Sequence, residues 1–512
     1  MLVLLATTLA LHPFDLVRVD DPEHPDADAT SATGAVLLAP PAAGTPWQYE
    51  TVPEVDRWTA VEALQAMNVD PWHERGVTGA GVKVAVFDLQ WFGSEGDPEE
   101  LGAFTTHDCY THRSCALPMD TWRPRFSFEE GVHGYACAEV LHDIAPDATL
   151  HLVRVNGQTT LENAVDWAVQ EGIDVASMSM SFFNASFYDG TGRVAGLMEK
   201  ARAGGVLMVV SAGNYADAHW QGHLVDSDLD GRMEFDGEDG LWVYLTAGSA
   251  RGIYLNWNQH SACGTSDLDA VLYDGEGRIV ERSLDRQDPD ADRCEPVERL
   301  TGRVEQDGWY RLEVFLERGA AVALDVDVLT TKGEIHGAMP EGSIVDPGVS
   351  PHAFTVGAVR AAGYFTNDVE GFSSRGPTIA GVSKPDIAGP DGLSTDAYGP
   401  VGFYGTSAAA PAVAGAVALV MSEDPTLTPF QAARRLQGWA AGDDVVFFEP
   451  DPRWGAGRAR LPAEPDASPG CGRRPLLLPF RCCFHWCYPP LAGCEGGDVT
   501  AAADAGALLT PG

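Results

Sequence analysis

The stretch GTSAAAPAVAGAVALV, from Gly405 to Val420, decides the fold of this chain. One hydroxyl residue, Ser407, precedes a run of small apolar residues, and nothing polar follows until Ser422. This pattern predicts a helix buried on all sides, with Ser407 at its N-terminus, where free amides and the helix dipole favour negative charge. We expect Pro411 to lie in the first turn, because a proline there loses no hydrogen bond. The small side chains predict close packing against a neighbouring helix or sheet.

The same segment has two simpler interpretations. No charged residue occurs from Ala397 to Ser422, which is also typical of a membrane span. The strictly apolar part, Ala408 to Met421, is shorter than the ~20 residues that a span needs. We therefore predict no transmembrane span. A plain core helix capped by a serine is the second interpretation, and only the rest of the chain can exclude it.

Composition limits the partners. The chain has 512 residues, enough for two or more domains, and 74 Asp and Glu against 33 Lys and Arg give a formal charge of −41. Such a surface repels nucleic acid and anionic membranes, so we expect no nucleic-acid partner. The sequence predicts no oligomeric state.

Strand and helix signals alternate through the first half of the chain, which predicts an α/β fold: a parallel sheet flanked by helices. Ligand sites in such sheets lie at the carboxyl ends of strands, and both Asp88 and Asn214 are predicted there. The predicted strands are 82–88, 149–155, 173–180 and 206–214, and the predicted helices are 133–145, 161–172 and 191–203. The pattern resumes at 354–359 and 384–392, with a last helix at 429–440.

The middle of the chain has a different pattern. Short segments between 241 and 331 alternate apolar and polar residues, and a Gly275–Gly277 turn separates two of them like a hairpin. This predicts an all-β sandwich, residues 219–331, inserted into the α/β domain.

The predicted organisation therefore has six parts. An apolar start, residues 1–19, indicates a secretion signal that lacks the usual basic residues, and 20–57 is a linker or short pro-segment. The α/β domain comprises 58–218 and 332–462 and surrounds the insertion, and a Cys/Pro/Gly-rich tail occupies 463–512. Paired cysteines suit an oxidising compartment, and we expect a disulfide between Cys263 and Cys294. For the tail, metal binding, cross-linking, disorder, a lipid anchor and a frame error all stay open.

An acid, a base and a hydroxyl nucleophile occur in the order Asp88, His133, Ser407. A serine hydroxyl attacks a carbonyl only when a base accepts its proton, and a carboxylate must hold that base in the right tautomer. The resulting oxyanion needs donors, which the Asn214 amide and the Ser407 backbone N–H can supply. Each residue alone is more typical of a cap or a structural histidine.

The flanking motifs exclude that simpler interpretation, because VAVFD, HGYACAEVLHDIAPDA, VVSAGN, FSSRGP, KPDI and GTSAAAP occur together and in this order. Over residues 76–214 and 340–460 the chain resembles the subtilisin-like serine peptidases (subtilases). The resemblance implies Asp88 as the orienting acid, His133 as general base and acid, Ser407 as nucleophile and Asn214 as oxyanion donor. It also implies substrate-binding residues in two segments: Ser179, Met180 and Ser181 in an edge strand that pairs with substrate, and Ala212 and Gly213 along the pocket before the scissile bond.

The chain departs from that family pattern at three sites. Leu89 and Gln90 follow the aspartate, Tyr135 stands where threonine is common, and Ser181-Phe182 replace two glycines of the substrate cleft. The side chains of Ser181 and Phe182 are expected to narrow or reshape the cleft, which affects substrate preference and efficiency rather than the triad.

No cofactor is required for this chemistry, but a structural calcium ion is a separate hypothesis. Asp226, Asp228 and Asp230 have the spacing of a calcium loop, although Gly237 stands where the bidentate glutamate is expected. A solvated acidic loop is the alternative.

The sequence thus predicts a secreted or cell-surface serine endopeptidase that acts on proteins or peptides through an acyl-enzyme. One alternative is a weakly active or inactive subtilase fold used as a binding module. The other is a serine esterase, which the GTSAA context disfavours because esterase nucleophiles lie in GxSxG.

Overall fold

The computed structural model describes residues 35–37, 59–91, 98–110, 113–119, 131–248, 250–260, 265–287, 295–319, 324–444 and 451–464. The predicted signal, the cysteine-rich tail and the Cys263–Cys294 disulfide lie outside these residues. The domain boundaries and the role of 20–57 stay predictions.

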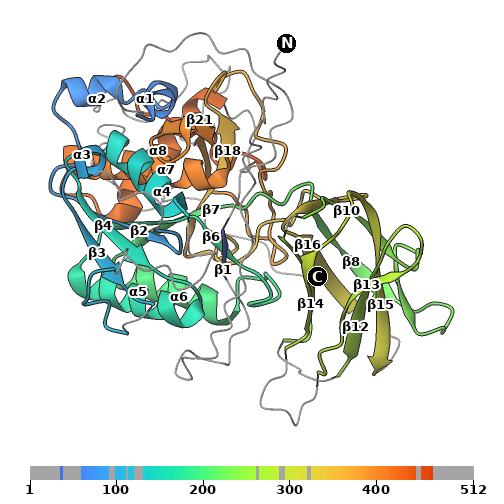
Figure 1. Cartoon of the computed structure of the whole chain (residues 1–512). Coiled ribbons are helices and arrows are strands. Elements are labelled where there is room, and N and C mark those ends of the chain that lie inside the picture. Colours follow the sequence, from blue (N-terminus) through green and yellow to red (C-terminus); the bar gives the residue numbers. More distant parts are fainter. Residues whose placement is uncertain are drawn as a thin grey trace, which may run out of the picture. The chain divides into compact units, whose positions relative to one another are not determined.

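A seven-stranded parallel sheet forms the centre of the α/β domain (Figure 1), in the order β19-β18-β7-β5-β2-β4-β3. This confirms the predicted fold class. The strands are β2 (Lys83–Asp88), β3 (Phe104–Asp108), β4 (Thr149–Arg154), β5 (Val175–Met178), β7 (Leu207–Ser211), β18 (Phe354–Arg360) and β19 (Ile387–Asp391).

Each face of the sheet is covered by helices because the strands are apolar on both faces. On β2, Val84 and Val86 pack in one core, while Ala85 and Phe87 pack in the other. The first core contains α4 (His133–Ile144), α7 (Thr406–Glu423) and α8 (Pro429–Asp444); the second contains α5 (Gln158–Glu171) and α6 (Gly192–Ala203). The short helices α1 (Val61–Ala66), α2 (Asp70–Glu74) and α3 (Pro98–Leu101) precede α4.

Helix α7 is the predicted core helix. Among the described residues it is the one helix with the length and hydropathy of a membrane span, but 89% of that window is buried inside the protein. The prediction for Pro411 is wrong: α7 begins at Thr406, so Pro411 is in the second turn and removes a helical hydrogen bond. The carbonyl group that loses this bond is that of Ser407, in the candidate active site.

The inserted segment is an antiparallel sheet, which is consistent with the predicted all-β insertion. The sandwich itself stays a prediction, because the strands are joined into one ten-stranded sheet in which β9 pairs with both β8 and β15. Apolar residues from strands along the whole sheet meet in a separate core. The predicted hairpin is confirmed as the pair β12–β13. The strands are β8 (His219–Val225), β9 (Arg232–Phe235), β10 (Leu241–Leu245), β11 (Ala250–Trp257), β12 (Asp267–Tyr273), β13 (Ile279–Ser283), β14 (Val297–Arg303), β15 (Gly308–Arg318), β16 (Leu324–Thr330) and β17 (Gly333–Ile335).

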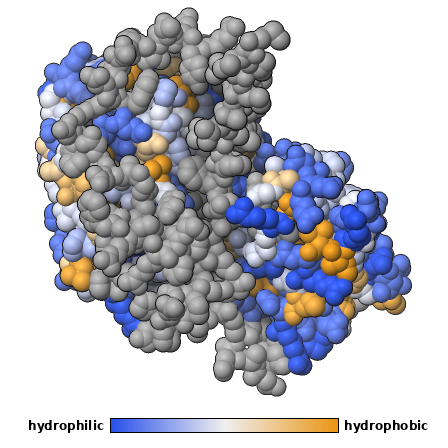
Figure 2. All heavy atoms as spheres, in the orientation of Figure 1, coloured by the Kyte–Doolittle hydropathy of each residue, from blue (hydrophilic) through white to orange (hydrophobic). Residues whose placement is uncertain are grey.

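Two features were not predicted. No strand was predicted between the segments of β2 and α4, yet β3 forms an edge strand of the parallel sheet there, followed by a Cys109–Cys115 disulfide. A small hairpin of β20 (Leu393–Thr395) and β21 (Gly399–Phe403) precedes α7. Hydrophilic residues cover most of the coloured surface in Figure 2, which agrees with the acidic composition.

Gly415 of α7 allows α7 and α4 to approach closely, since a Cβ there would lie 2.9 Å from Ile144 Cβ. Gly196 of α6 is a matched helical glycine with no atom within 4 Å of the same position. Gly196→Ala should raise the free energy of unfolding by about 1 kcal/mol through helix propensity. Gly415→Ala should lower it by about 1–3 kcal/mol through overpacking. Urea unfolding of both variants tests this, and a stabilised Gly415→Ala protein would contradict the close packing.

Candidate active site

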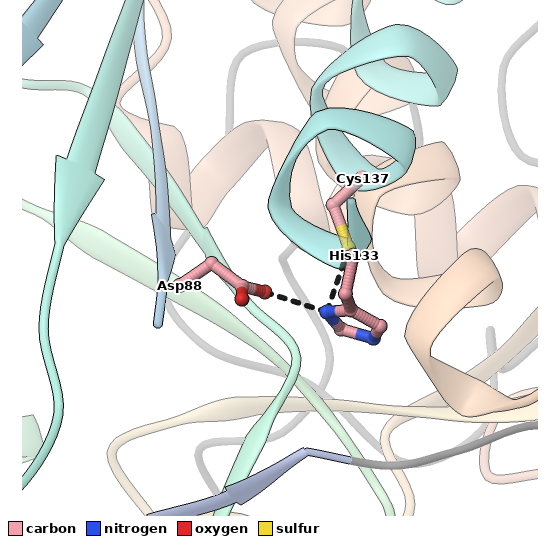
Figure 3. A group of neighbouring side chains, drawn as sticks. All are labelled: Asp88, His133 and Cys137. Carbon is pink, nitrogen blue, oxygen red and sulfur yellow. Dashed lines mark hydrogen bonds and ion pairs between the residues drawn. The ribbon is translucent and has the colours of Figure 1, made fainter. Parts of the chain in front are cut away.

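Asp88 and His133 form a buried pair (Figure 3). Asp88 is the last residue of β2 and His133 is the first residue of α4, and their side chains are 0% and 2% exposed. His133 Nδ1 lies 2.7 Å from Asp88 Oδ2. Burial alone would lower the pKa of His133, but the charge of Asp88 and hydrogen bonds to Asp88 and Cys137 raise it well above its usual value. The Asp88 carboxylate therefore fixes Nδ1 as the protonated nitrogen and leaves Nε2 for chemistry.

The close approach of α4 to the end of β2 depends on Gly134. A Cβ at this position would lie 2.8 Å from Gln90 O and 2.9 Å from Asp88 Cβ. The Gly134 N–H donates to Gln90 O, and the Gln90 N–H donates to Asp88 Oδ1 at 2.9 Å. These contacts use backbone atoms of residue 90, so the unusual Leu89-Gln90 sequence is compatible with a correctly held Asp88. Tyr135 is also accommodated, with its ring against the edge of Trp91.

Hydrogen bonds donated to the Ser407 carbonyl group hold the first turn of α7 in place. In a regular helix the N–H of residue 411 would donate to this carbonyl, but Pro411 has no N–H. The Ser179 hydroxyl donates to Ser407 O instead at 3.1 Å, and the Cys137 thiol donates at 3.6 Å. Burial raises the pKa of the Cys137 thiol, so the thiol keeps its proton for this bond. Cys137 lies one turn after His133 and 3.9 Å from its Nδ1 (Figure 3), which links the Ser407 segment to the base.

Asn214 is oriented by Thr406. Its Oδ1 accepts hydrogen bonds from the Thr406 N–H at 3.0 Å and the Thr406 hydroxyl at 2.9 Å. Because a backbone N–H can only donate, these bonds assign the other amide atom as Nδ2. Nδ2 is buried, and no hydrogen-bond partner for it occurs among the described residues. A buried amide without a partner is costly, and such an atom at a helix N-terminus is available to an oxygen of a bound substrate.

Gly405 brings Asn214 and the start of α7 together. Its φ of +104° is in the region that favours glycine, and a Cβ there would lie 2.8 Å from Asn214 Nδ2. Its N–H donates to Asp391 Oδ2 at 3.0 Å. Burial, with the neighbouring charge of Glu370, raises the pKa of Asp391 to about 8. The segment before Ser407 is therefore fixed to the end of β19.

The predicted substrate strand is a real edge strand. β6 (Met180–Phe182) pairs antiparallel with β1 (Ala35–Leu37), with Val36 opposite Ser181, so this edge already accepts a peptide segment. Ser179 directly precedes β6. The Phe182 side chain packs in the core with α5 and α6, so the expectation that it narrows the cleft is wrong: the strand alternation turns it inward.

The other predicted substrate segment lies after β7. The Ala212 N–H donates to Val356 O at 2.9 Å, and Gly213 O accepts from the Ser374 N–H at 2.8 Å. Gly213 has a φ of +109°, and a Cβ there would lie 2.8 Å from both Ser374 Oγ and the Tyr215 ring. Ala212 is thus held by a residue of β18 and Gly213 by Ser374, and the ring of Tyr215 lies directly against Gly213.

The acidic loop of the insertion brings Asp226, Asp228 and Asp230 together, with carboxylate oxygens within 4.8 Å of one another. Three hard oxygen donors fit a calcium ion. The same carboxylates also accept backbone N–H groups of the loop, including Asp226 from Gly231 at 3.1 Å. The donor set therefore fits calcium but lacks the bidentate glutamate, as the sequence predicted.

Sequence reasoning missed three residues around Ser407: Cys137, Thr406 and Asp391. A signal for the first was present. A proline in the second turn cannot donate to the carbonyl four residues earlier. Pro411 therefore indicated that other donors lie near Ser407 O.

With this geometry established, comparison with known proteins identifies the family. The model of the subtilase family matches residues 129–252 and 329–457, and the gap between the two segments falls inside the β insertion. The first segment contains His133 and Asn214 and the second contains Ser407. The chain therefore belongs to the subtilase family.

Two relatives come from Bacillus subtilis (strain 168). The minor extracellular protease Vpr is 26% identical over an alignment of 437 residues that covers 77% of this chain and 52% of Vpr. The serine protease AprX is 33% identical over 129 residues, 20% of this chain and 29% of AprX. The chain thus spans about half or less of the length of these relatives. The structure of the CspB protease of Clostridium perfringens matches with a TM-score of 0.54 and 16% identity, covering 78% of this chain and 97% of that one, which shows a shared fold.

The raised pKa of His133 gives a pH prediction. A general base must be neutral, so kcat/KM should rise with pH through an apparent pKa above the usual 6.5 of histidine. Asp88→Asn removes the charge that raises this pKa, so the acidic limb should move to lower pH while kcat falls by about 10⁴-fold. Hydrolysis of an activated ester from pH 5 to 10 measures both effects. An acidic limb that does not move in Asp88→Asn would contradict this account of the pair.

Proposed function

We propose that the chain is a serine endopeptidase that cleaves peptide bonds through Asp88, His133 and Ser407. One observation carries the proposal: two buried polar atoms, His133 Nε2 and Asn214 Nδ2, have no hydrogen-bond partner within the described part of the chain. The first can accept a proton and the second can stabilise an oxyanion. Both belong to residues that contact the Ser407 segment, through Cys137 and Thr406.

The mechanism follows from these positions. His133 Nε2 accepts the proton of the Ser407 hydroxyl as its oxygen attacks the substrate carbonyl, and Asp88 stabilises the imidazolium that forms. Asn214 Nδ2 and the Ser407 backbone N–H, at the positive end of α7, donate to the oxyanion. His133 then protonates the leaving amine. A water molecule, deprotonated by the same base, resolves the acyl-enzyme.

The proposed substrates are proteins or peptides that add a strand to the edge of β6, as β1 does. Ala212 and Gly213 would line the pocket for the side chain before the scissile bond. Secretion is part of the proposal, since relatives include a protease named as extracellular and Cys109 and Cys115 form a disulfide.

Two observations favour the alternative, a subtilase fold that binds without efficient cleavage. The Ser407 side chain is 0% exposed, and β1 occupies the edge of β6. Substrate therefore needs a rearrangement before it can reach Ser407, and a chain in which this never occurs would only bind.

Removal of the oxyanion donor tests the proposed chemistry. Asn214→Ala should lower kcat by about 10²–10³-fold with a small change in KM, the scale known for the same change in subtilisin, because the amide acts only when charge develops. Steady-state hydrolysis of peptide nitroanilides measures this, with Ser407→Ala as the inactive reference. A wild-type kcat in Asn214→Ala would remove Asn214 from the mechanism. A folded wild-type protein no faster than Ser407→Ala would favour the binding module.

We also propose that Asp226, Asp228 and Asp230 bind a structural calcium ion. Calcium at 100 times its dissociation constant should stabilise the folded protein by about 2.7 kcal/mol. Thermal unfolding in calcium and in EDTA measures this. Asp228→Asn should lose the effect, whereas Asp236→Asn, a nearby acidic position outside the cluster, should keep it. Equal melting temperatures in calcium and EDTA would leave the loop as a solvated turn.

A further inference from the structure

The segment that follows the substrate strand β6 contacts the β insertion. Phe183 stacks on Tyr254 of β11, with ring centroids 4.6 Å apart and an interplanar angle of 22°. The Asn256 amide, two residues after Tyr254, donates at 2.5 Å to Ser186 O, three residues after Phe183. The Asn184 amide donates to Glu298 O of β14 at 3.4 Å. The chain after β6 is therefore held by side-chain and backbone atoms of two insertion strands.

The alternation along β11 explains this contact. Ile253, Leu255 and Trp257 point into the core of the insertion, so Tyr254 and Asn256 face the opposite way. Leu329 is opposite Tyr254 on β16 and packs in a small cluster with Phe183 and Tyr215. One face of the strands β11 and β16 thus fills the insertion's own core, and the other face packs against residues of the α/β domain.

The aromatic contacts continue to the second substrate segment. The edge of Tyr215 packs on Phe183, with centroids 5.3 Å apart at an angle of 77°. The ring of Tyr215 also lies against Gly213, where a Cβ would be 2.8 Å from its Cδ2. Tyr254, Phe183 and Tyr215 therefore connect β11 of the insertion to both segments of the substrate site, one through Phe183 after β6 and the other through Tyr215 after Gly213.

We propose that Tyr254 is a positioning residue of the substrate site, through which the insertion sets the pocket for the side chain before the scissile bond. This proposal rests on the proposed peptidase function. Tyr254 does not touch the reacting atoms. It fixes the ring of Phe183, and through it the ring of Tyr215, so that the end of β6 and Gly213 keep their spacing. Because a packed interior transmits strain, loss of one ring shifts the others.

Four variants test this role. Tyr254→Ala removes the ring, and Tyr254→Phe keeps the stacking and serves as the conservative rescue. Gly252→Ala displaces the ring without removing it, because the new Cβ would lie 2.5 Å from Tyr254 Cε2, and the φ of Gly252 is outside the left-handed region. Tyr244→Ala is the matched control, since Tyr244 makes an aromatic contact with Trp309 within the insertion itself.

Kinetics on tetrapeptide nitroanilides with Phe, Leu or Ala before the scissile bond give the first readout. In Tyr254→Ala and Gly252→Ala, kcat/KM for the Phe substrate should fall by about 10- to 100-fold, which is the effect of a displacement of about 1 Å. The Ala substrate should be affected less, so the Phe-to-Ala preference changes. Tyr254→Phe and Tyr244→Ala should keep the wild-type preference. A general loss of folding would instead lower kcat/KM for all three substrates and the melting temperature together.

Amide hydrogen exchange gives a second readout that does not need activity. Exchange at residues 179–188 and 212–216 should be faster in Tyr254→Ala and in Gly252→Ala than in Tyr244→Ala, while α4 and β2 keep their protection. If the wild-type protein proved inactive, the proposed function would fail, and this exchange pattern would still decide the role of Tyr254. Unchanged preference together with unchanged exchange in folded Tyr254→Ala would overturn the proposal; Gly252→Ala decides it if Tyr254→Ala fails to fold.

Discussion

The regular helical hydrogen bond to the Ser407 carbonyl cannot form, because residue 411 is a proline, and the candidate active site is arranged around this constraint. Ser179, next to the substrate strand, and Cys137, one turn after His133, donate to that carbonyl. The bonds fix the first turn of α7 to the strand that is proposed to bind substrate and to the helix that carries the base. Below them, Gly415 allows α7 and α4 to pack at short distance. The proposed nucleophile and the proposed base thus keep their spacing through contacts of one buried helix.

The remaining polar groups follow from the same arrangement. Thr406 satisfies only the oxygen of the Asn214 amide and leaves its nitrogen available. Asp88 satisfies only Nδ1 of His133 and leaves Nε2 available. Burying these two atoms without hydrogen-bond partners costs free energy. This cost is explained if the transition state of a bound substrate supplies the partners. Asn214 Nδ2 and His133 Nε2 are therefore available where the proposed reaction develops charge.

The sequence predicted the sheet and the helices because periodicity is a local property, and motif order alone led to the proposal of Asp88, His133, Asn214 and Ser407 as site residues. It placed Pro411 in the wrong turn, since α7 begins only one residue before Ser407 and nothing local marks that boundary. It assigned Phe182 to the cleft because strand register, which decides the direction of a side chain, depends on tertiary pairing. The roles of Cys137, Tyr215 and Tyr254 depend on contacts between distant segments, and no single-sequence pattern contains them. The insertion was visible as a change of period, but its contact with the substrate segments was not.

The central claim is that Ser407 is a nucleophile activated by His133. The most direct measurement is reaction of the purified protein with a fluorophosphonate, followed by mass mapping of the modified peptide, with Ser407→Ala and Asp88→Asn in parallel. The account predicts one adduct on Ser407, none in Ser407→Ala and much slower labelling in Asp88→Asn. A processed and folded wild-type protein that carries no adduct, or carries it on another residue, would contradict it.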